Sequence, residues 1–135
     1  MTRPAVHLPE RLRSEIIDHC RSELPNEGCG LIALAGDQIV RVYPTDNKDR
    51  SPSGFTIPPE QHYAALTDAE SNGWALGGVF HSHPHGTAKP SMVDVQTALD
   101  PDWVYLVVGL RGGTDMRAWS IREGEIDEVD LLVDP

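Results

Sequence analysis

Three segments of the chain have the features of helices, which we expect over residues 9–24, 59–71 and 91–99. In the first segment, Leu12, Ile16 and Cys20 recur every four positions and form one apolar stripe opposite charged residues. The second segment stops at Asn72-Gly73, which is a typical C-terminal signal. The third opens with Ser-x-x-Asp, a sequence of the kind that caps a helix.

Apolar runs between these segments predict strands over residues 29–35, 38–43, 74–80, 103–110, 116–121 and 126–133. The first two flank Gly36-Asp37 and have the pattern of a hairpin. The run WVYLVVGL is almost entirely apolar, so we expect it to be a central, buried strand. The last two strands should be antiparallel neighbours. The pattern therefore predicts an α+β fold, a mixed sheet sandwiched by about three helices, in one domain that spans residues 1–135.

Charge limits the classes of partner. The chain has 135 residues, with 21 acidic side chains against 11 Lys and Arg and a formal net charge of −10. This charge disfavours nucleic acid or an anionic membrane as the main partner and permits a basic protein partner. No stretch approaches the roughly 20 apolar residues that span a bilayer, and the N-terminus lacks the apolar run of a signal peptide, so we expect a cytoplasmic protein. We interpret Cys20 and Cys29 as buried thiols, with a redox pair as the alternative.

The segment VFHSHPHGTAKPSMVDV, residues 79–95, holds the candidate chemistry. If the strand before it continues, His81 and His83 point to the same face, with Cα atoms roughly 6.5–7 Å apart. Two imidazoles at that separation can bind one ion at Zn–N distances of about 2.0–2.1 Å. Pro84 ends the strand because it has no N–H for the ladder.

Asp94 is the best candidate for a third metal ligand. It lies in the first turn of the next predicted helix, where a carboxylate is favoured. A catalytic zinc commonly has three protein ligands and keeps its fourth position for water. Taken alone, His-x-His is weak support for a metal site, and Ser91-x-x-Asp94 is more often a helix cap than a catalytic element. The two roles can coexist, and the combination at this spacing is far more specific than its parts.

The segment HSHPHGTAKPSMVD resembles the JAMM motif of the MPN+ metalloproteases, His-x-His-Pro followed by Ser-x-x-Asp. That family also places a glutamate upstream, before a Cys-Gly-Leu strand, and PNEGCGLIALAG supplies Glu27 at the matching position. The segments GFTIPPEQHYAAL and DPDWVYLVVGL are similar to small bacterial members, and the likeness covers nearly the whole chain. The resemblance implies an MPN/JAMM fold, which is cytidine-deaminase-like.

The resemblance also implies roles for individual residues. His81, His83 and Asp94 would hold one zinc ion with a water as its fourth ligand, Glu27 would be the general acid/base, and Ser91 would stabilise the tetrahedral intermediate. The family hydrolyses peptide or isopeptide bonds after the C-terminal Gly-Gly tail of a ubiquitin-like or sulfur-carrier protein, and some bacterial members release cysteine from such a carrier. The identity of the carrier, the leaving group (lysine, cysteine or a peptide) and the oligomeric state stay open.

Two other functions are alternatives to this one. A catalytically silent MPN-type protein-binding scaffold does not need all five of these residues, and a RadC-like DNA-repair protein would be longer and carry a helix-hairpin-helix segment. A zinc deaminase would need His-x-Glu and Pro-Cys-x-x-Cys, and the sequence contains neither. We expect His85 to face solvent or substrate rather than the metal. We expect His7, His19 and His62 at the surface, and the three tryptophans in the core or in groove walls.

Overall fold

The structure is a computed structural model that describes residues 3–98 and 100–135. Within these residues the strands are β1 (Ala5–Pro9), β2 (Cys29–Ala35), β3 (Gln38–Thr45), β4 (Ala75–His83), β5 (Val104–Gly109), β6 (Asp115–Arg122) and β7 (Glu125–Asp134). The helices are α1 (Glu10–Ser22), α2 (Pro59–Ser71) and α3 (Met92–Thr97). No helix among the described residues has the length and apolar character needed to cross a bilayer.

The predicted helices and strands are all present, with shifts at their ends. The second helix has the predicted bounds, whereas α1 begins one residue later than expected because Pro9 is its N-cap rather than its first residue. Ser91 caps α3, and the predicted end of that helix at Leu99 lies outside the described residues. The strand expected to end at residue 80 continues to His83, so the condition for placing both histidines on one strand is met.

The strand β1 is the element that the sequence did not predict. Its burial alternates along AVHLP, with Val6 and Leu8 inside, but five residues ending in proline give too short a pattern to recognise. β1 pairs in parallel with β7 over five residues and touches β3 at one position, His7 beside Gln38. These pairings close the sheet into a barrel of order β1-β3-β2-β4-β5-β6-β7.

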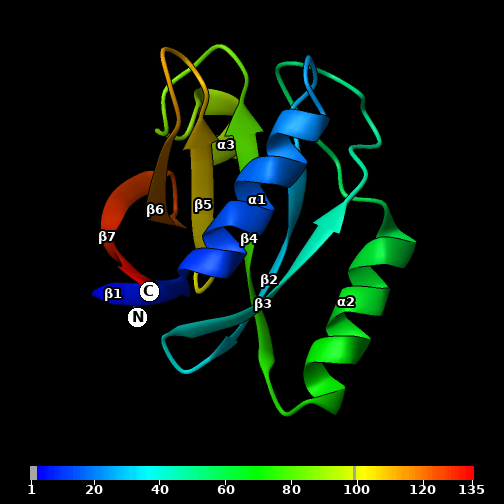
Figure 1. Cartoon of the computed structure of the whole chain (residues 1–135), viewed down its shortest axis with the longest axis vertical. Helices are drawn as coiled ribbons and strands as arrows, with labels where there is room; N and C mark the ends of the chain where they lie inside the picture. The colour runs from blue at the N-terminus through cyan, green and yellow to red at the C-terminus, as the bar shows by residue number, and fades with distance from the viewer. Residues whose placement is uncertain (1–2, 99) are drawn as a thin grey trace.

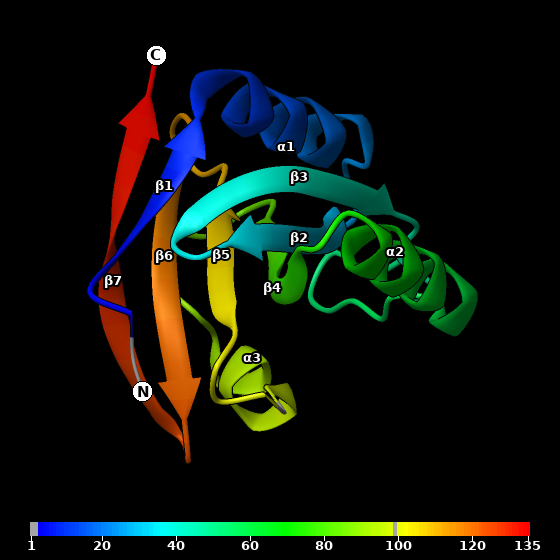
Figure 2. The same ribbon diagram turned by 90° about the horizontal axis from the view of Figure 1, so that it is seen from below.

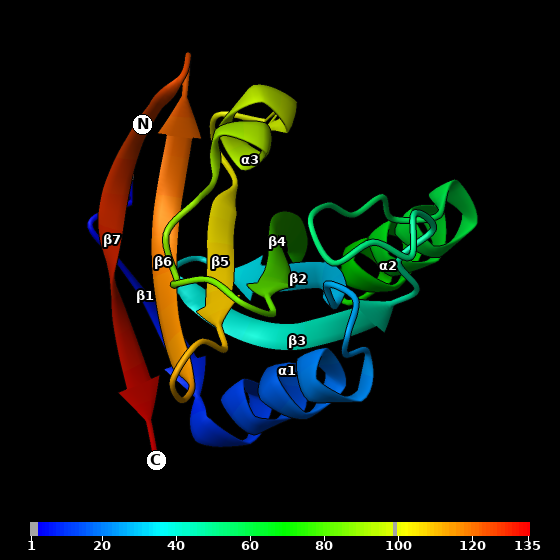
Figure 3. The ribbon, with the colours of Figure 1, turned by 90° about the horizontal axis from the view of Figure 1, so that it is seen from above.

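Two apolar clusters cover the two faces of the sheet. One lies under α1, where Leu12, Ile16 and Cys20 pack against β1, β3 and the inner face of the central strands. The other lies under α2, whose Ala65 and Ala69 pack on β2, β4 and β5. Figures 1 and 2 show α1 on one side of the central strands and α2 and α3 on the other, as the predicted sandwich requires. In Figure 3, α3 lies beside the upper part of β5, opposite α1.

The central strands determine where the site forms. β2 and β4 are antiparallel, with Cys29 opposite His81, and β4 and β5 are parallel, with His83 opposite Gly109. β6 and β7 are antiparallel neighbours, as predicted. The end of β4 therefore meets the start of β2, and the chain turns from His83 through a loop into α3 beside it. This turn brings three separate sequence segments to one place.

Candidate metal centre

His81 and His83 lie at the C-terminal end of β4, on the same face of the strand. Their Nε2 atoms are 3.2 Å apart. The side chain of Ser82 points the other way, is fully buried, and its Oγ accepts a hydrogen bond of 2.9 Å from the Gly28 N–H. The alternation of a strand therefore separates the two imidazoles from the hydroxyl between them.

Asp94 completes a compact cluster of ligand atoms. Its Oδ2 lies 3.0 Å from Nε2 of His81 and 2.9 Å from Nε2 of His83. Ligands about 2.0–2.1 Å from a tetrahedral ion lie roughly 3.3 Å from one another, so the observed spacing of 2.9–3.2 Å nearly matches that arrangement. Two imidazole nitrogens and one carboxylate oxygen are also the donor types of known catalytic zinc sites. The three residues therefore fit a metal ion without rearrangement of the fold.

A backbone carbonyl selects the tautomer of His83. The Nδ1–H of His83 donates a 2.8 Å hydrogen bond to the carbonyl of Thr87, which leaves the lone pair of the neutral ring on Nε2, the atom that faces the cluster. The loop that holds Thr87 is itself fixed, because Trp119 Nε1 donates to the Ala88 carbonyl at 2.8 Å. A Cβ added to Gly109 would come within 2.6 Å of this loop, so only glycine at the end of β5 leaves enough room for the loop.

Asp94 is both a helix-capping residue and a member of the cluster. Its N–H donates to the Ser91 Oγ at 3.1 Å, and its Oδ2 accepts from the Ser91 N–H at 2.8 Å, which is the capping box that the sequence predicted. Burial alone would raise the pKa of Asp94, but the contacts with His81, His83 and the Ser91 N–H outweigh it and hold the pKa well below its usual range. The carboxylate is therefore ionised and ready to bind a cation.

Glu27 lies beside the cluster because of the register in which β2 pairs with β4. Cys29 pairs with His81, and the Ser82 N–H donates to the Gly28 carbonyl at 3.0 Å, so the ladder continues one step before β2. Glu27, the next residue, therefore arrives at the end of β4. It is 4% exposed, and within the described part of the chain its Oε1 is buried without a hydrogen-bond partner.

The electrostatic setting of Glu27 differs from that of Asp94. Burial raises the pKa of Glu27 to about 7, against the opposing effect of positive charge on His83, and the Asp94 carboxylate adds to the rise. For His83, burial lowers the pKa, but the contacts with Asp94 and the Thr87 carbonyl prevail, so the net pKa is raised. A carboxyl group with a pKa near neutrality can accept or release a proton at physiological pH.

A groove of about 560 Å³ leads away from the cluster along the sheet, between α2 and α3. His81 and Asp94 lie at one end of it, and the ring of Phe55 stacks on the His81 ring with centroids 4.8 Å apart. Farther along, Trp103 and Tyr105 line its wall, as we expected for a tryptophan outside the core. The groove could take an extended, narrow chain segment whose end reaches the cluster.

The remaining predicted residues lie mostly as expected. His85 is exposed in the loop after β4 and is outside the cluster formed by His81, His83 and Asp94. His62 is exposed at the rim of the groove, but His19 is half-buried and its Nε2 lies 3.0 Å from the Thr45 carbonyl, so its expected surface position is only partly correct. Cys20 and Cys29 are free, buried thiols, and burial raises the pKa of each, to about 12 and about 11.

Sequence reasoning missed three residues near the cluster. They are Thr87, which fixes His83, Phe55, which stacks on His81, and Asn47, which donates a 3.1 Å hydrogen bond to the Glu27 carbonyl. Phe55 and Asn47 belong to the mostly polar segment between β3 and α2, for which the sequence predicted no helix or strand. An asparagine and an aromatic residue inside such a polar segment were the available signal.

Comparisons with known proteins agree with this geometry. A sequence model of the family described as prokaryotic homologs of the JAB domain matches residues 9–122. The chain is 34% identical over 131 residues to a probable TtuB-protein conjugate cleaving protease of Thermus thermophilus, an alignment that covers 95% of this chain and 82% of that relative. It is 29% identical over 129 residues to the CysO-cysteine peptidase of Mycobacterium tuberculosis, covering 90% of this chain and 86% of the peptidase.

The similarity to solved structures extends over almost the whole chain. The solution structure of a protein from Desulfitobacterium hafniense has a TM-score of 0.86 and 35% sequence identity, and the match covers 96% of this chain and 92% of that one. The arrangement of strands and helices described above is therefore shared with an experimentally determined structure.

Proposed function

The chain belongs to the family of prokaryotic homologs of the JAB domain, and from this premise we propose that it is a zinc-dependent peptidase for a ubiquitin-like or sulfur-carrier protein. The bond cleaved would be the peptide or isopeptide bond after the carrier's C-terminal Gly-Gly. The observation that carries the proposal is the cluster of His81, His83 and Asp94 with Glu27 beside it, whose buried Oε1 has no hydrogen-bond partner among the described residues. Residues 1–135 would act as one catalytic domain in the cytoplasm, which suits two free thiols.

His81, His83 and Asp94 would hold one zinc ion and leave a fourth position for water. Zinc supplies Lewis acidity, because it lowers the pKa of a bound water to about 7 and can polarise an amide carbonyl. The three ligand atoms already face one another, and the Thr87 carbonyl keeps the lone pair of His83 directed at the cluster. The ligand shell is thus preorganised by side chains and by one backbone carbonyl.

Glu27 would move the protons. Its free Oε1 can take a proton from the attacking water and return it to the leaving nitrogen, a role that typically contributes 10²–10⁴-fold to the rate. Its pKa of about 7 places both protonation states within reach at neutral pH. A carboxylate fully occupied by hydrogen bonds could not exchange protons so readily.

Ser91 would stabilise the developing oxyanion. Its Oγ accepts the Asp94 N–H at 3.1 Å, which leaves the hydroxyl proton available to a substrate oxygen. The position at the start of α3 places this hydroxyl beside the Asp94 ligand. A hydroxyl directed at the developing charge stabilises the transition state more than the ground state.

The groove suits the proposed substrate. A Gly-Gly tail has no side chains, so it could approach the cluster closely, with the preceding residues lying against Phe55, Trp103 and Tyr105. The related Thermus and Mycobacterium enzymes are named for conjugates of TtuB and for CysO-cysteine, which supports a small carrier protein as the substrate class. The two names differ in leaving group, so both a protein lysine and a free cysteine need to be tested.

The test uses defined substrates. Zinc-loaded protein is incubated with Gly-Gly-terminated carrier proteins of the same organism, each linked to cysteine, to a lysine side chain or to a short peptide, and the products are weighed by mass spectrometry. We expect cleavage directly after Gly-Gly for at least one leaving group, about 10²–10⁴-fold slower with Glu27→Gln and absent with an Ala-Ala tail. Binding of carriers without cleavage by the zinc-loaded protein would instead favour a protein-binding scaffold.

A further inference from the structure

Glu27 is held at the site through its backbone. Its N–H donates to the Ser51 carbonyl at 2.9 Å, and its carbonyl accepts from Nδ2 of Asn47 at 3.1 Å. Its carboxylate has a buried oxygen without a partner among the described residues. The place of the carboxylate is therefore set by the position of the peptide groups on either side of Glu27. Both partners, Ser51 and Asn47, come from the loop between β3 and α2, residues 46–58.

Asn47 uses its entire hydrogen-bonding capacity inside the protein. Nδ2 donates to the carbonyls of Glu27 and Gly54, at 3.1 and 3.0 Å. Oδ1 accepts from the N–H groups of Asp49 and Thr56, at 3.0 and 3.2 Å. A primary amide has two N–H donors and two acceptor lone pairs, so all four are used. The side chain is only 6% exposed, which makes these bonds costly to break.

The same amide fixes the residue that stacks on a metal ligand. Gly54 and Thr56, two of its partners, are the chain neighbours of Phe55. The Phe55 ring stacks on the His81 ring with centroids 4.8 Å apart and an interplanar angle of 25°. The Asn47 side chain thus binds both the backbone of Glu27 and the two peptide groups on either side of Phe55, whose ring stacks on His81. The loop links the proton-transfer group to the metal ligands.

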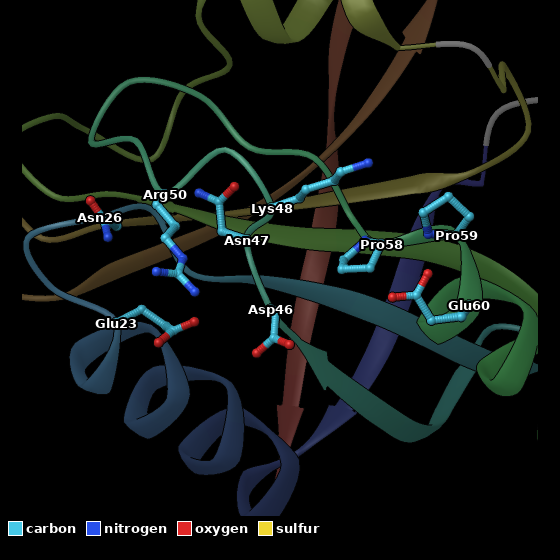
Figure 4. A pocket seen from close by; sticks show the side chains of 9 residues that line it. All are labelled: Glu23, Asn26, Asp46, Asn47, Lys48, Arg50, Pro58, Pro59 and Glu60. Carbon is cyan, nitrogen blue, oxygen red and sulfur yellow. The ribbon is translucent and has the colours of Figure 1, made fainter.

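On the outer side of this loop, Asn47 has no separate role in binding a ligand. A second cleft, of about 580 Å³, lies there, and Figure 4 shows the nine side chains that line it. Four of the nine are exposed charged groups of both signs, Asp46, Lys48, Arg50 and Glu60, and only Asn47 and Pro58 are buried. Because the amide of Asn47 has no donor or acceptor left over, it cannot bind a ligand in this cleft without giving up a bond to the loop or to Glu27.

We propose that Asn47 is a positioning residue, which sets the place of the Glu27 carboxylate by binding the Glu27 carbonyl and bracing the loop that holds Phe55 against His81. The proposal rests on the function proposed for Glu27. A displaced carboxylate would slow proton transfer while the metal ligands, which come from β4 and α3, stay in place. A displacement of about 1 Å can cost as much as 100-fold in rate.

The first test is Asn47→Asp, with Asn72→Asp as the matched control. The new carboxylate keeps both acceptor roles but places an oxygen against the carbonyls of Glu27 and Gly54. Asn72 is an exposed amide at the end of α2 that donates to the Asp68 carbonyl at 2.8 Å, so its change tests the same chemistry away from the site. We expect N47D to lower kcat about 10- to 100-fold, with KM changed less than about threefold and zinc content unchanged, and N72D to match the wild type.

The outcomes separate this proposal from the function on which it rests. An inactive wild type, or a fully active Glu27→Gln, refutes the proposed function. With an active wild type and a slowed Glu27→Gln, a normal kcat for folded N47D overturns the role of Asn47. A fall in kcat that matches the loss of zinc content and folded protein also overturns it, because that result marks a merely structural residue.

A second measurement needs no variant and decides the matter if N47D does not fold. Side-chain amide hydrogen exchange is followed by NMR in the wild-type protein, with and without zinc. The proposed bonding predicts that the Nδ2 hydrogens of Asn47 exchange at least about 100-fold more slowly than those of Asn72 in both forms. Equal exchange rates for the two side chains would show that the Asn47 amide is not held and would overturn the proposal.

Discussion

The two halves of the site are held in different ways. His81, His83 and Asp94 contact one another directly, and the Thr87 carbonyl and the Ser91 N–H anchor the ring and the carboxylate. Glu27, by contrast, is held through its backbone N–H and carbonyl, and one carboxylate oxygen has no partner in the described structure. A ligand needs a fixed direction, whereas a proton-transfer group needs a fixed place and a free lone pair. The comparison predicts that the two halves can be disabled separately.

The largest effect is expected from Asp94→Ala. The change removes one proposed ligand and the capping-box bond that Asp94 Oδ2 accepts from the Ser91 N–H, so we expect zinc affinity to fall by more than the roughly 100-fold that loss of a supporting residue can cost, and cleavage to be lost. Zinc content after dialysis against buffered zinc measures this. Asp18→Ala, an exposed carboxylate on α1, is the control. Full zinc occupancy in the Asp94 variant would show that Asp94 caps α3 but does not bind the metal.

Glu27→Gln should disable the other half alone. The amide keeps the shape of the side chain but cannot carry the proton, so we expect kcat to fall about 10²–10⁴-fold while zinc content stays at the wild-type level. Turnover at saturating substrate and metal analysis of the same sample test this together. Loss of zinc in this variant would mean that the two halves are not independent.

Acid should act on the metal half first. The ligands must be unprotonated to bind zinc, and the pKa of Asp94 lies far below the usual range while that of His83 is raised above its ordinary 6.5. Zinc affinity should therefore be constant at high pH and fall about tenfold per pH unit once the pH drops below the raised pKa of His83. Zinc titrations with a competing chelator measure this. Glu27→Gln should keep the high-pH affinity, with the fall beginning at a lower pH because the Glu27 charge contributes to the raised pKa of His83. A loss of zinc affinity at high pH in that variant would place Glu27 among the ligands.

The smallest effect concerns the stability of the metal-free protein. Burial raises the pKa of Glu27 from 4.5 to about 7, so the folded state binds this proton more tightly than the unfolded state. The resulting stabilisation is complete below pH 4.5 and is lost as the pH rises through 7. Glu27→Gln should then be more stable than the wild type at pH 8, by on the order of 2 kcal/mol, but not at pH 4. Urea unfolding in the presence of EDTA at pH 4 and at pH 8 measures the free energy of unfolding of both proteins and checks the sign of the difference.

Local patterns predicted most of the elements and brought together the three residues of the candidate metal centre. The helix over residues 59–71 was predicted with its observed bounds, and His81, His83 and Asp94 lie together as their spacing indicated. The family suggested by HSHPHGTAKPSMVD and by Glu27 is confirmed by the match over residues 9–122. The position of Glu27 beside β4 could not be deduced from local pattern, because it depends on the register between β2 and β4.

The contacts of the loop over residues 46–58 were beyond sequence reasoning for the same reason. Asn47 and Phe55 have no periodicity, and their partners Glu27 and His81 are distant in sequence. β1 was missed because five residues provide too little alternation, although its pairing with β7 closes the sheet.

The closure by β1 affects how the protein can be handled. In the described structure each strand has a neighbour on both sides, so no edge is open for edge-to-edge aggregation. The seam is narrow on one side, where β1 meets β3 only at His7 and Gln38. Deletion of residues 1–9 would open the seam and uncover the edge of β7 over the five residues that β1 now covers. Shortening the N-terminus to aid crystallisation should therefore lower solubility, whereas an extension after Pro135 would leave the seam intact.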